Sequence, residues 1–342
     1  MTIARPKIMP RLRHGLLPGI LIALGISLLA VLAEAAEQAL LGRSWLEALV
    51  VAILLGTGLR TLWTPPRATE PGISFTAKYP LEVAILLLGA TLDSKVVLAA
   101  GLPLVVGIAL VVVLAIGGSY MLGRAVGLGH RMAILVAAGN SICGNSAIAA
   151  IAPVIGADND DIAASIAFTA VLGVATVLAM PILAMMLNLS ALQSGVVAGL
   201  TVYAVPQVIA AAAPIGLVSV QMGTLVKLLR VMMLGPVMAA MALGHGDRAA
   251  AGAGITRFVP WFLIGFIIMA GLRSAGLIPE AAMAPIHGLT SALTVVSMAA
   301  LGLGVDMRML RRAGGRVAAA ALMSLVLIGA MSLGLVRLLG IA

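Results

Sequence analysis

The stretch from Ile162 to Val226 contains no Asp, Glu, Lys, Arg or His. One membrane span takes about 20 apolar residues, so this stretch alone has room for two spans and part of a third. Of the 342 residues, 62% are hydrophobic and 10% are charged, whereas soluble domains carry about 25% charged residues. We therefore expect an all-α polytopic membrane protein. The same figures exclude a soluble enzyme, a disordered chain and a secreted disulfide scaffold.

The rarer residue types narrow the class further. The chain has one cysteine, Cys143, and four histidines without metal-ligand spacing, so we expect no internal disulfide, no metal site and no cofactor. Aromatic residues make up 3%, too few for the girdles of a membrane β-barrel. No nucleophile–base arrangement appears in the apolar core, so an enzyme is not expected. We attribute the net charge of +9 to the Lys and Arg excess of cytoplasmic loops and expect no nucleic-acid partner.

Hydropathy predicts eleven transmembrane helices joined by short loops. They are expected near residues 15–33, 46–62, 73–92, 98–123, 131–156, 160–188, 195–213, 219–243, 258–273, 283–306 and 315–339. Fifteen Lys and Arg residues fall in one set of alternate loops and four in the other, which predicts a cytoplasmic N-terminus and a C-terminus on the opposite side. The first apolar run follows four basic residues and imitates a signal peptide, but its length favours an uncleaved helix.

Two weak internal echoes suggest repeated architecture. Residues 89–95 resemble residues 302–308, and a glycine, Gly101 or Gly314, follows each segment at the same distance. These helix ends lie seven predicted spans apart on opposite sides of the membrane, which is the parity of an inverted repeat. A second echo relates residues 148–153 to residues 209–214 at a different offset, and alanine-rich helices match in this way by chance.

Residues 139–146 place two Gly, two Asn and two Ser in the middle of an uncharged stretch. Unpaired amides and freed backbone groups are costly in hydrocarbon, so these residues indicate a special structure. Gly139 and Gly144 permit a break in the helix, and the free amides that begin the second half favour an anion. We predict a discontinuous helix of the kind that forms substrate sites in transporters. A small-residue packing seam with Asn–Asn hydrogen bonds is the alternative.

Two further segments carry polar groups within apolar runs. Around Pro206, which disfavours helix at the preceding residue, Tyr203 and Gln207 supply a hydroxyl and an amide. A simple proline kink with a packed tyrosine is the alternative there. Further along, four polar residues recur every three positions, hence on one helix face: Gln221, Thr224, Lys227 and Arg230.

Charged groups inside a membrane span are a functional hypothesis by default. Lys227 and Arg230 could hold an anion or pair with Glu82, although snorkelling to the interface would equally explain Lys227. His287 begins a span with a stripe of Thr and Ser that could line the site or simply pack. Cys143 is expected to be a small residue within the break.

Four segments resemble the YeiH-type sulfate-exporter family of bacterial inner-membrane proteins: residues 139–144, 227–234, 260–262 and 298–302. The resemblance covers nearly the whole chain. It implies a fold like that of cation:proton antiporters and bile-acid transporters, with two inverted five-helix repeats, discontinuous crossing helices and one added N-terminal helix. Within one transporter domain, residues 1–45 would form that helix, 46–190 the first repeat and 191–342 the second. Some members carry a His-Glu pair where this chain has Tyr203-Ala204, which puts proton coupling there in doubt.

We therefore expect a secondary transporter that moves a small anion, such as sulfate or a related oxoanion or sulfonate, across the inner membrane by alternating access. The residues expected to bind it are Asn140, Ser141, Cys143, Gly144, Asn145, Ser146, Tyr203, Gln207 and Arg230, and the candidates for charge or coupling are Glu82, Lys227 and His287. Besides the anion, the expected partners are lipid, H⁺ or Na⁺ as coupling ion, and a second copy in a homodimer. The rivals are a cation/proton exchanger of the same fold and a non-transporting scaffold or sensor.

Overall fold

The computed structural model describes residues 12–41, 47–91, 94–244, 261–308 and 314–341, and these residues form helices and no strand. The helices are α1 (Leu12–Leu41), α2 (Ala48–Leu62), the 3₁₀-helix η1 (Arg67–Thr69), α3 (Glu70–Ala90), α4 (Ser94–Ala125), α5 (His130–Ala138), the π-helix η2 (Gly139–Cys143), α6 (Asn145–Ile155), α7 (Asn159–Met186), α8 (Ala191–Thr201), α9 (Val205–Ala212), α10 (Leu217–Met232), α11 (Leu234–Gly244), α13 (Trp261–Ser274), α14 (Glu280–Leu303) and α16 (Gly315–Leu338).

Each segment predicted to span the membrane overlaps helical structure. In the described part of the chain, seven helical segments are long and apolar enough to cross a membrane: Leu16–Leu40, Arg67–Ala90, Gly101–Ala125, Asp160–Met186, Leu217–Met241, Glu280–Leu303 and Gly315–Leu338. Shorter apolar helices are α2, α6, α8 and α13. The chain is thus a multi-pass membrane protein whose described residues are helical, and the count of eleven transmembrane spans stays a prediction. Several predicted features lie outside the described residues: Arg5, Lys7, Arg11, Arg43, Asp93, Arg248, Arg257, Pro260, Arg311 and Arg312.

The chain divides into two compact units. The first unit comprises Met1–Ala84 and Leu289–Asp306, and the second comprises Ile85–Gly288 and Met307–Ala342. Helices α3 and α14 each begin in one unit and end in the other. This division groups residues by contact and leaves the predicted inverted repeats, 46–190 and 191–342, as a prediction.

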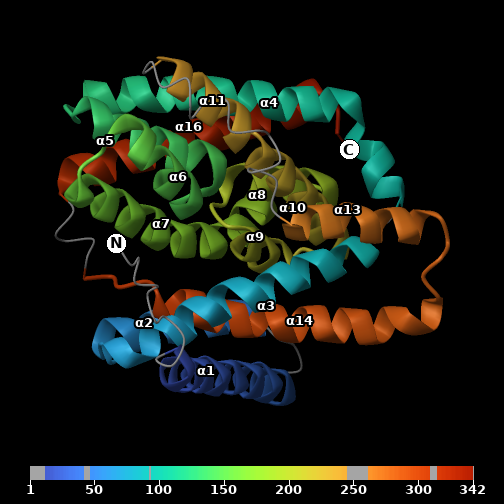
Figure 1. Ribbon diagram of the computed structural model, residues 1–342. Helices are drawn as coiled ribbons and strands as arrows, with labels where there is room; N and C mark the ends of the chain where they lie inside the picture. Colours follow the sequence, from blue (N-terminus) through green and yellow to red (C-terminus); the bar gives the residue numbers. More distant parts are fainter. Residues whose placement is uncertain (1–11, 42–46, 92–93, 245–260, 309–313, 342) are drawn as a thin grey trace, which may run out of the picture. The chain divides into compact units, whose positions relative to one another are not determined.

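Glycines bring the helices of the first unit into backbone contact. A Cβ atom on Gly56 of α2 would lie 2.5 Å from the carbonyl oxygen of Ala299 in α14. Gly19 of α1 and Gly72 of α3 face each other in the same way. Helices in lipid associate through such close approach of small residues. Glycine thus allows close helix pairs in this unit. Figure 1 shows α1 and α2, in blue, beside the start of α3.

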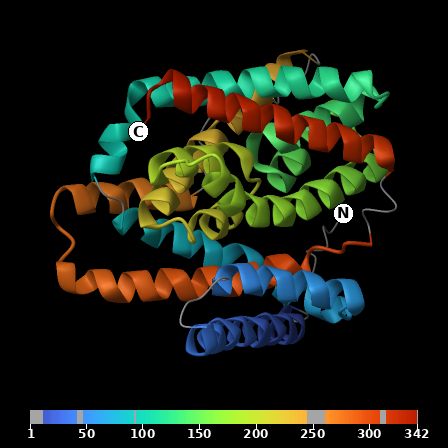
Figure 2. The ribbon, with the colours of Figure 1, turned by 180° about the vertical axis from the view of Figure 1, so that it is seen from behind.

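In the second unit, α4 and α16 lie side by side, as the opposite views of Figures 1 and 2 both show. A buried hydrogen bond joins their hydroxyls, Ser119 and Ser324, at 2.5 Å. Their outer faces carry exposed apolar side chains, including Val113 and Val326. Contiguous exposed apolar surface marks a contact with another apolar phase, which for these long helices is lipid.

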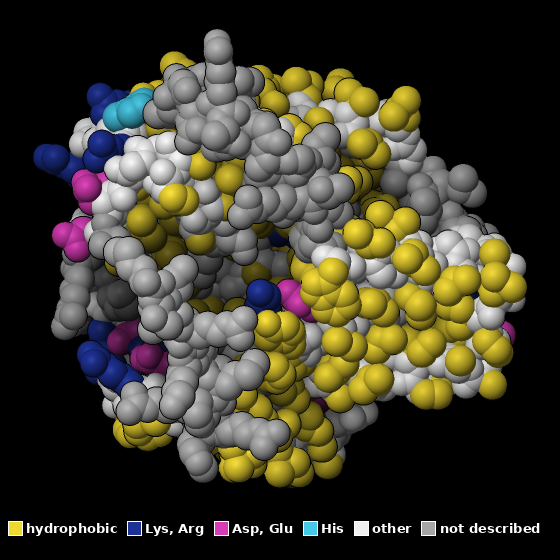
Figure 3. Space-filling model, in the orientation of Figure 1, with side chains coloured by type: hydrophobic (Ala, Val, Ile, Leu, Met, Phe, Trp, Pro, Cys, Tyr) yellow, Lys and Arg dark blue, Asp and Glu magenta, His cyan; other side chains and the backbone are white. Residues whose placement is uncertain are grey.

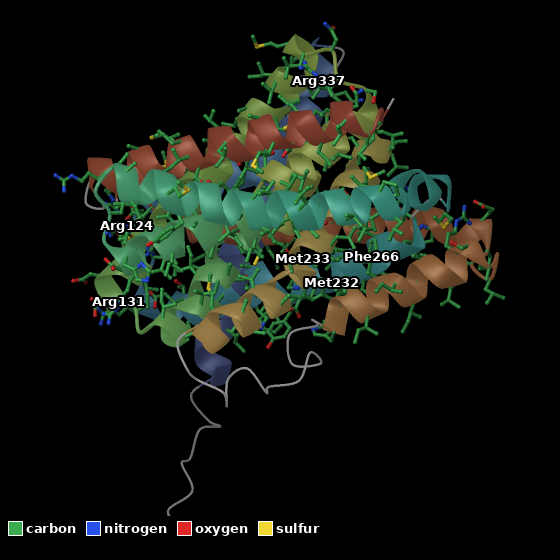
Figure 4. All side chains as sticks on the ribbon, turned by 90° about the horizontal axis from the view of Figure 1, so that it is seen from above. Arg124, Arg131, Met232, Met233, Phe266 and Arg337 are labelled. Carbon is green, nitrogen blue, oxygen red and sulfur yellow. The ribbon has the colours of Figure 1, made fainter. Side chains whose placement is uncertain are left out.

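Charged side chains lie at the ends of the second unit. Arg124 and Arg131 lie together where α4 ends and α5 begins, and Arg337 lies far from them near the end of α16 (Figure 4). In Figure 3 most Lys, Arg, Asp, Glu and His side chains of the visible face gather along its left edge, whereas the right part of that face is largely hydrophobic. Nearby, Arg131 forms a 3.7 Å ion pair with Asp158. The predicted span 131–156 would place Arg131 and Asp158 on opposite sides of the membrane, so their ion pair shows that this segment turns back instead of crossing. Which side is cytoplasmic stays a prediction.

Helix α10 packs closely against α8 because glycines line their contact. A Cβ on Gly195 would lie 2.7 Å from the carbonyl oxygen of Ser219, and one on Gly199 would lie 2.6 Å from that of Gly223. Gly195 and Gly199 are four residues apart on α8, which is the small-xxx-small spacing of close helix pairs. This contact positions the polar face of α10 against the centre of the unit.

We predict that Gly195→Ala destabilises the protein by about 1–3 kcal/mol, because the added methyl group forces the α8 and α10 backbones apart. The matched control is Gly117→Ala on α4, where an added Cβ meets nothing within 4 Å. There the change is expected to be neutral or to stabilise by up to about 1 kcal/mol, since alanine is the better helix former. Thermal unfolding of both purified variants in detergent measures the difference, and equal melting temperatures would contradict the close contact.

Candidate functional site

The polar segment predicted to break a helix does so at Gly144. Helix α5 continues into the π-helix η2, Gly144 follows with φ 66° and ψ −128°, and α6 begins at Asn145. The amide of Gly144 donates to the carbonyl of Gly139 at 2.8 Å, while its own carbonyl accepts from the amides of Ala147 and Ile148. This backbone conformation is open to glycine and strained for other residues. The predicted break in the helix is confirmed, but α5 and α6 form a hairpin whose ends, Arg131 and Asp158, lie 3.7 Å apart.

A second break lies between α8 and α9. Helix α8 ends at Thr201, the next residues are extended, and α9 starts at Val205 with Pro206 in its first turn. The side-chain oxygen of Gln207 accepts the amide of Ala204 at 3.1 Å, so Gln207 caps the start of α9. A Cβ added to Gly144 would lie 3.2 Å from the Cβ of Tyr203, which shows that the two breaks touch. We call the two breaks, residues 139–144 and 200–204, the crossing.

The side chains of Lys227 and Arg230 bind the carbonyl ends of both interrupted helices. The Nζ atom of Lys227 donates to the carbonyl oxygens of Ile142, at 2.8 Å, and Val202, at 2.9 Å. The guanidinium of Arg230 donates to four carbonyl oxygens: those of Asn140 at 2.7 Å, Ser141 at 3.1 Å, Gly199 at 3.0 Å and Leu200. Lys227 is 0% and Arg230 1% exposed, so neither side chain snorkels to water.

These contacts satisfy groups that a broken helix leaves open. The last carbonyls of a helix have no partner within it, and they carry the negative end of the helix dipole. All six hydrogen bonds of the two cations end on such carbonyls. The described acidic residues of the second unit, Asp158, Asp160, Asp161 and Glu280, lie at the starts of α7 and α14 and bond to neither cation. Glu82 is buried in the first unit, and its predicted pairing with Arg230 stays a prediction.

The remaining residues of the predicted polar face of α10 are also buried. Gln221 is 4% exposed and its side-chain amide donates to the carbonyl of Thr91, just after α3. Thr224 is 0% exposed. The spacing of three therefore places all four side chains inside the protein, as the sequence indicated.

Several buried polar atoms at the crossing have no hydrogen-bond partner among the described residues. They are Oδ1 of Asn140, Oγ of Ser141, Oη of Tyr203 and, on α10, Oγ1 of Thr224. Buried polar atoms are nearly always paired, because desolvation without a hydrogen bond is costly. Unpartnered polar atoms at the two breaks and on α10 make the crossing the candidate site for a polar ligand or ordered water.

The other predicted site residues lie in different surroundings. Asn145 and Ser146 are exposed at the start of α6, and Asn145 accepts a 2.6 Å hydrogen bond from the hydroxyl of Thr169 on α7. Cys143 is buried within η2. His287 is half-buried on α14 and makes no hydrogen bond to the crossing in the described residues.

A cavity of about 460 Å³ opens at the end of the second unit that carries Arg316 and Asp161. Glycines preceding α5 and α16, such as Gly129 and Gly314, form part of its lining. Three more lining residues belong to the buried hydrophobic cluster that surrounds Tyr203: Leu128, Met132 and Val317. Tyr203 therefore belongs to the same buried cluster as part of the cavity lining, a grouping that the sequence did not predict.

Comparison of the sequence with known proteins places the chain in a family. A family model described as "Conserved hypothetical protein 698" matches residues 18–321. A UPF0324 membrane protein of Brucella melitensis is 54% identical over 338 residues, which cover 98% of this chain and 95% of the relative. One of Agrobacterium fabrum is 54% identical over 98% of this chain and 97% of its own. One of Bacillus cereus is 34% identical over 93% of this chain and 94% of its own.

We predict that Arg230→Met opens the crossing, because four carbonyl groups lose a charged donor and each such hydrogen bond is worth about 1.5–3 kcal/mol. The single cysteine of the chain reports this opening, since Cys143 is buried in the break. Maleimide labelling of Cys143 should be at least about tenfold faster in the variant than in the wild type. Arg337→Met, at an exposed position on α16, is the matched control and should label at the wild-type rate.

Replacing Gly144 should destabilise the second unit independently of any charge. Gly144→Ala places a side chain at φ 66°, ψ −128° and against Tyr203, so we expect a loss of about 1–3 kcal/mol. Thermal unfolding in detergent measures it. Unchanged stability would show that this segment adopts another backbone conformation.

Proposed function

The chain belongs to the UPF0324 family of membrane proteins, and from this premise we propose that it is a secondary transporter of small anions, with sulfate or a related oxoanion or sulfonate as substrate. Family membership also confirms the resemblance to YeiH-type proteins that the sequence motifs indicated. The proposed site is the crossing, and the mechanism is alternating access of that site to the two sides of the membrane.

The observation that carries this proposal is the buried pair Lys227 and Arg230. Two cationic side chains are buried in an apolar helical unit, and within the described residues every hydrogen bond that they donate goes to a neutral carbonyl. Buried charges are usually paired with an opposite charge. An anionic substrate would supply that charge during transport.

The helix ends at the crossing do not offset the charges of Lys227 and Arg230. The carbonyl ends of η2 and α8 contribute about −0.5 elementary charge each, and the amide ends of α6 and α9 about +0.5 each. These contributions largely cancel, which leaves the charges of the two side chains. The amide ends favour an anion, as helix N-termini do elsewhere. A cation exchanger would instead need a carboxylate at this position, and the crossing contains none.

The wider architecture follows from the same proposal. In this proposal the seven long helices and the short helices α2 and α13 cross the membrane. The interrupted pairs α5–α6 and α8–α9 turn back instead, because Arg131 lies 3.7 Å from Asp158 and because α8 runs parallel to α10, with Gly195 beside Ser219 and Gly199 beside Gly223. The excess of Lys and Arg in alternate loops then places the N-terminus in the cytoplasm and the C-terminus in the periplasm of an inner membrane. Coupling to H⁺ or Na⁺ and inverted repeats belong to the same proposal.

The test is sulfate uptake into proteoliposomes that contain the purified protein, with and without a pH gradient. Lys227→Gln separates a functional charge from a structural cap, because the glutamine amide retains two N–H donors for the carbonyls of Ile142 and Val202. We expect it to fold but to lose at least about tenfold in flux, whereas Arg337→Gln transports normally. Full flux in Lys227→Gln would make the cation a cap only. Absence of sulfate flux in folded wild-type protein would contradict the sulfate assignment.

A further inference from the structure

One buried atom at the crossing would remain unsatisfied if a fully deprotonated anion bound there. Asn140 is 1% exposed, and its Nδ2 atom donates to the carbonyl oxygen of Ala321 on α16 at 2.9 Å. Its Oδ1 atom has no partner among the described residues. A carbonyl oxygen only accepts, so Ala321 fixes the amide with Nδ2 toward α16, and Oδ1 is the atom left without a partner. Whatever binds Oδ1 must donate a hydrogen bond.

The residue that carries this acceptor is bound to one of the cations through its main chain, because the carbonyl of Asn140 accepts from Arg230 at 2.7 Å. The carbonyls of the consecutive residues Asn140, Ser141 and Ile142 bind Arg230 and Lys227, so the Asn140 side chain leaves the same turn of the chain. In the hydrogen bonds to the two breaks, Arg230 uses four N–H donors and Lys227 uses two. A guanidinium has five N–H donors and an ammonium three, which leaves one on each side chain.

The hydroxyls of Ser141 and Tyr203 add two groups that can donate or accept. The crossing therefore contains positive charge and donors for an anionic group, and the same segment carries one obligate acceptor, Oδ1 of Asn140. A ligand that brings only acceptors would leave Oδ1 of Asn140 buried and unpaired, which costs binding free energy.

We propose that the substrate is an anion that carries its own hydrogen-bond donor, namely a hydroxy- or amino-substituted sulfonate or a protonated oxoanion. Its anionic oxygens face Lys227 and Arg230, and its donor binds Oδ1 of Asn140. The inference rests on the proposed function and narrows its substrate class. A fully deprotonated sulfate ion is then a weaker ligand than a donor-bearing anion of similar size.

Two probes of equal charge and equal heavy-atom number test this. They are 2-hydroxyethanesulfonate and 1-propanesulfonate, which differ by a hydroxyl in place of a methyl group. Titration calorimetry with the purified full-length protein in detergent should give a Kd at least about tenfold lower for the hydroxyl compound, because only that compound pairs the buried acceptor. An equal Kd, or tighter binding of the more apolar probe, would overturn the proposal and assign Oδ1 to an ordered water.

A variant tests whether the preference for the hydroxyl probe arises at Asn140. Asn140→Leu removes the acceptor at similar volume, so the ratio of the two Kd values should fall to about one. The control is Ser194→Ala, which removes another buried hydroxyl without a partner, on α8 outside the crossing, and should keep the wild-type ratio. A preference that survives in Asn140→Leu would overturn the assignment to this residue. The comparison of probes on wild-type protein stands even if the variant does not fold.

The outcomes also separate the two proposals. Equal binding of both probes, together with sulfate flux, defeats the donor inference and leaves the transporter proposal intact. If neither probe nor sulfate binds or moves, the anion transporter proposal fails and the donor inference fails with it.

Discussion

Hydrogen bonds from two buried cations to the carbonyl ends of two interrupted helices hold the centre of this protein together. A helix that stops inside an apolar bundle exposes carbonyl groups that water does not reach, and such groups are costly. Lys227 and Arg230 satisfy them from one helix, α10. The glycine contact of α8 with α10 follows from the same need, because it brings the cations within hydrogen-bond distance of the carbonyls.

The sequence predicted those features for which a side chain carries the signal. Long uncharged stretches located the helices, and glycine with asparagine and serine located the break at Gly144. Pro206 marked the second segment without deciding between a break and a simple kink, and the spacing of three placed Lys227 and Arg230 on one face, which is buried. In each case the cost of a polar or helix-breaking group in an apolar segment is large enough to be visible without a structure.

The partners of these groups could not be predicted, because they are main-chain atoms. Every residue has a carbonyl, so nothing in the letters singles out Val202 or Ala321 as an acceptor. Thr169 looked like any threonine of a long apolar helix, although it donates to Asn145. The alanine-rich echo of residues 148–153 and 209–214 seemed a chance match, yet these segments lie in, or directly continue, the second halves of the two interrupted helices.

Lys227 bonds to one carbonyl in each break, and this restricts how the two interrupted helices can move relative to each other. The carbonyl oxygen of Ile142, in η2, and that of Val202, just after α8, both accept a hydrogen bond from the Nζ atom of Lys227. Neither interrupted helix can slide past the other without breaking a charged hydrogen bond in a medium that offers no replacement. The two breaks and α10 therefore form one rigid body, and any movement that exposes the crossing must carry this body as a whole or take place around it.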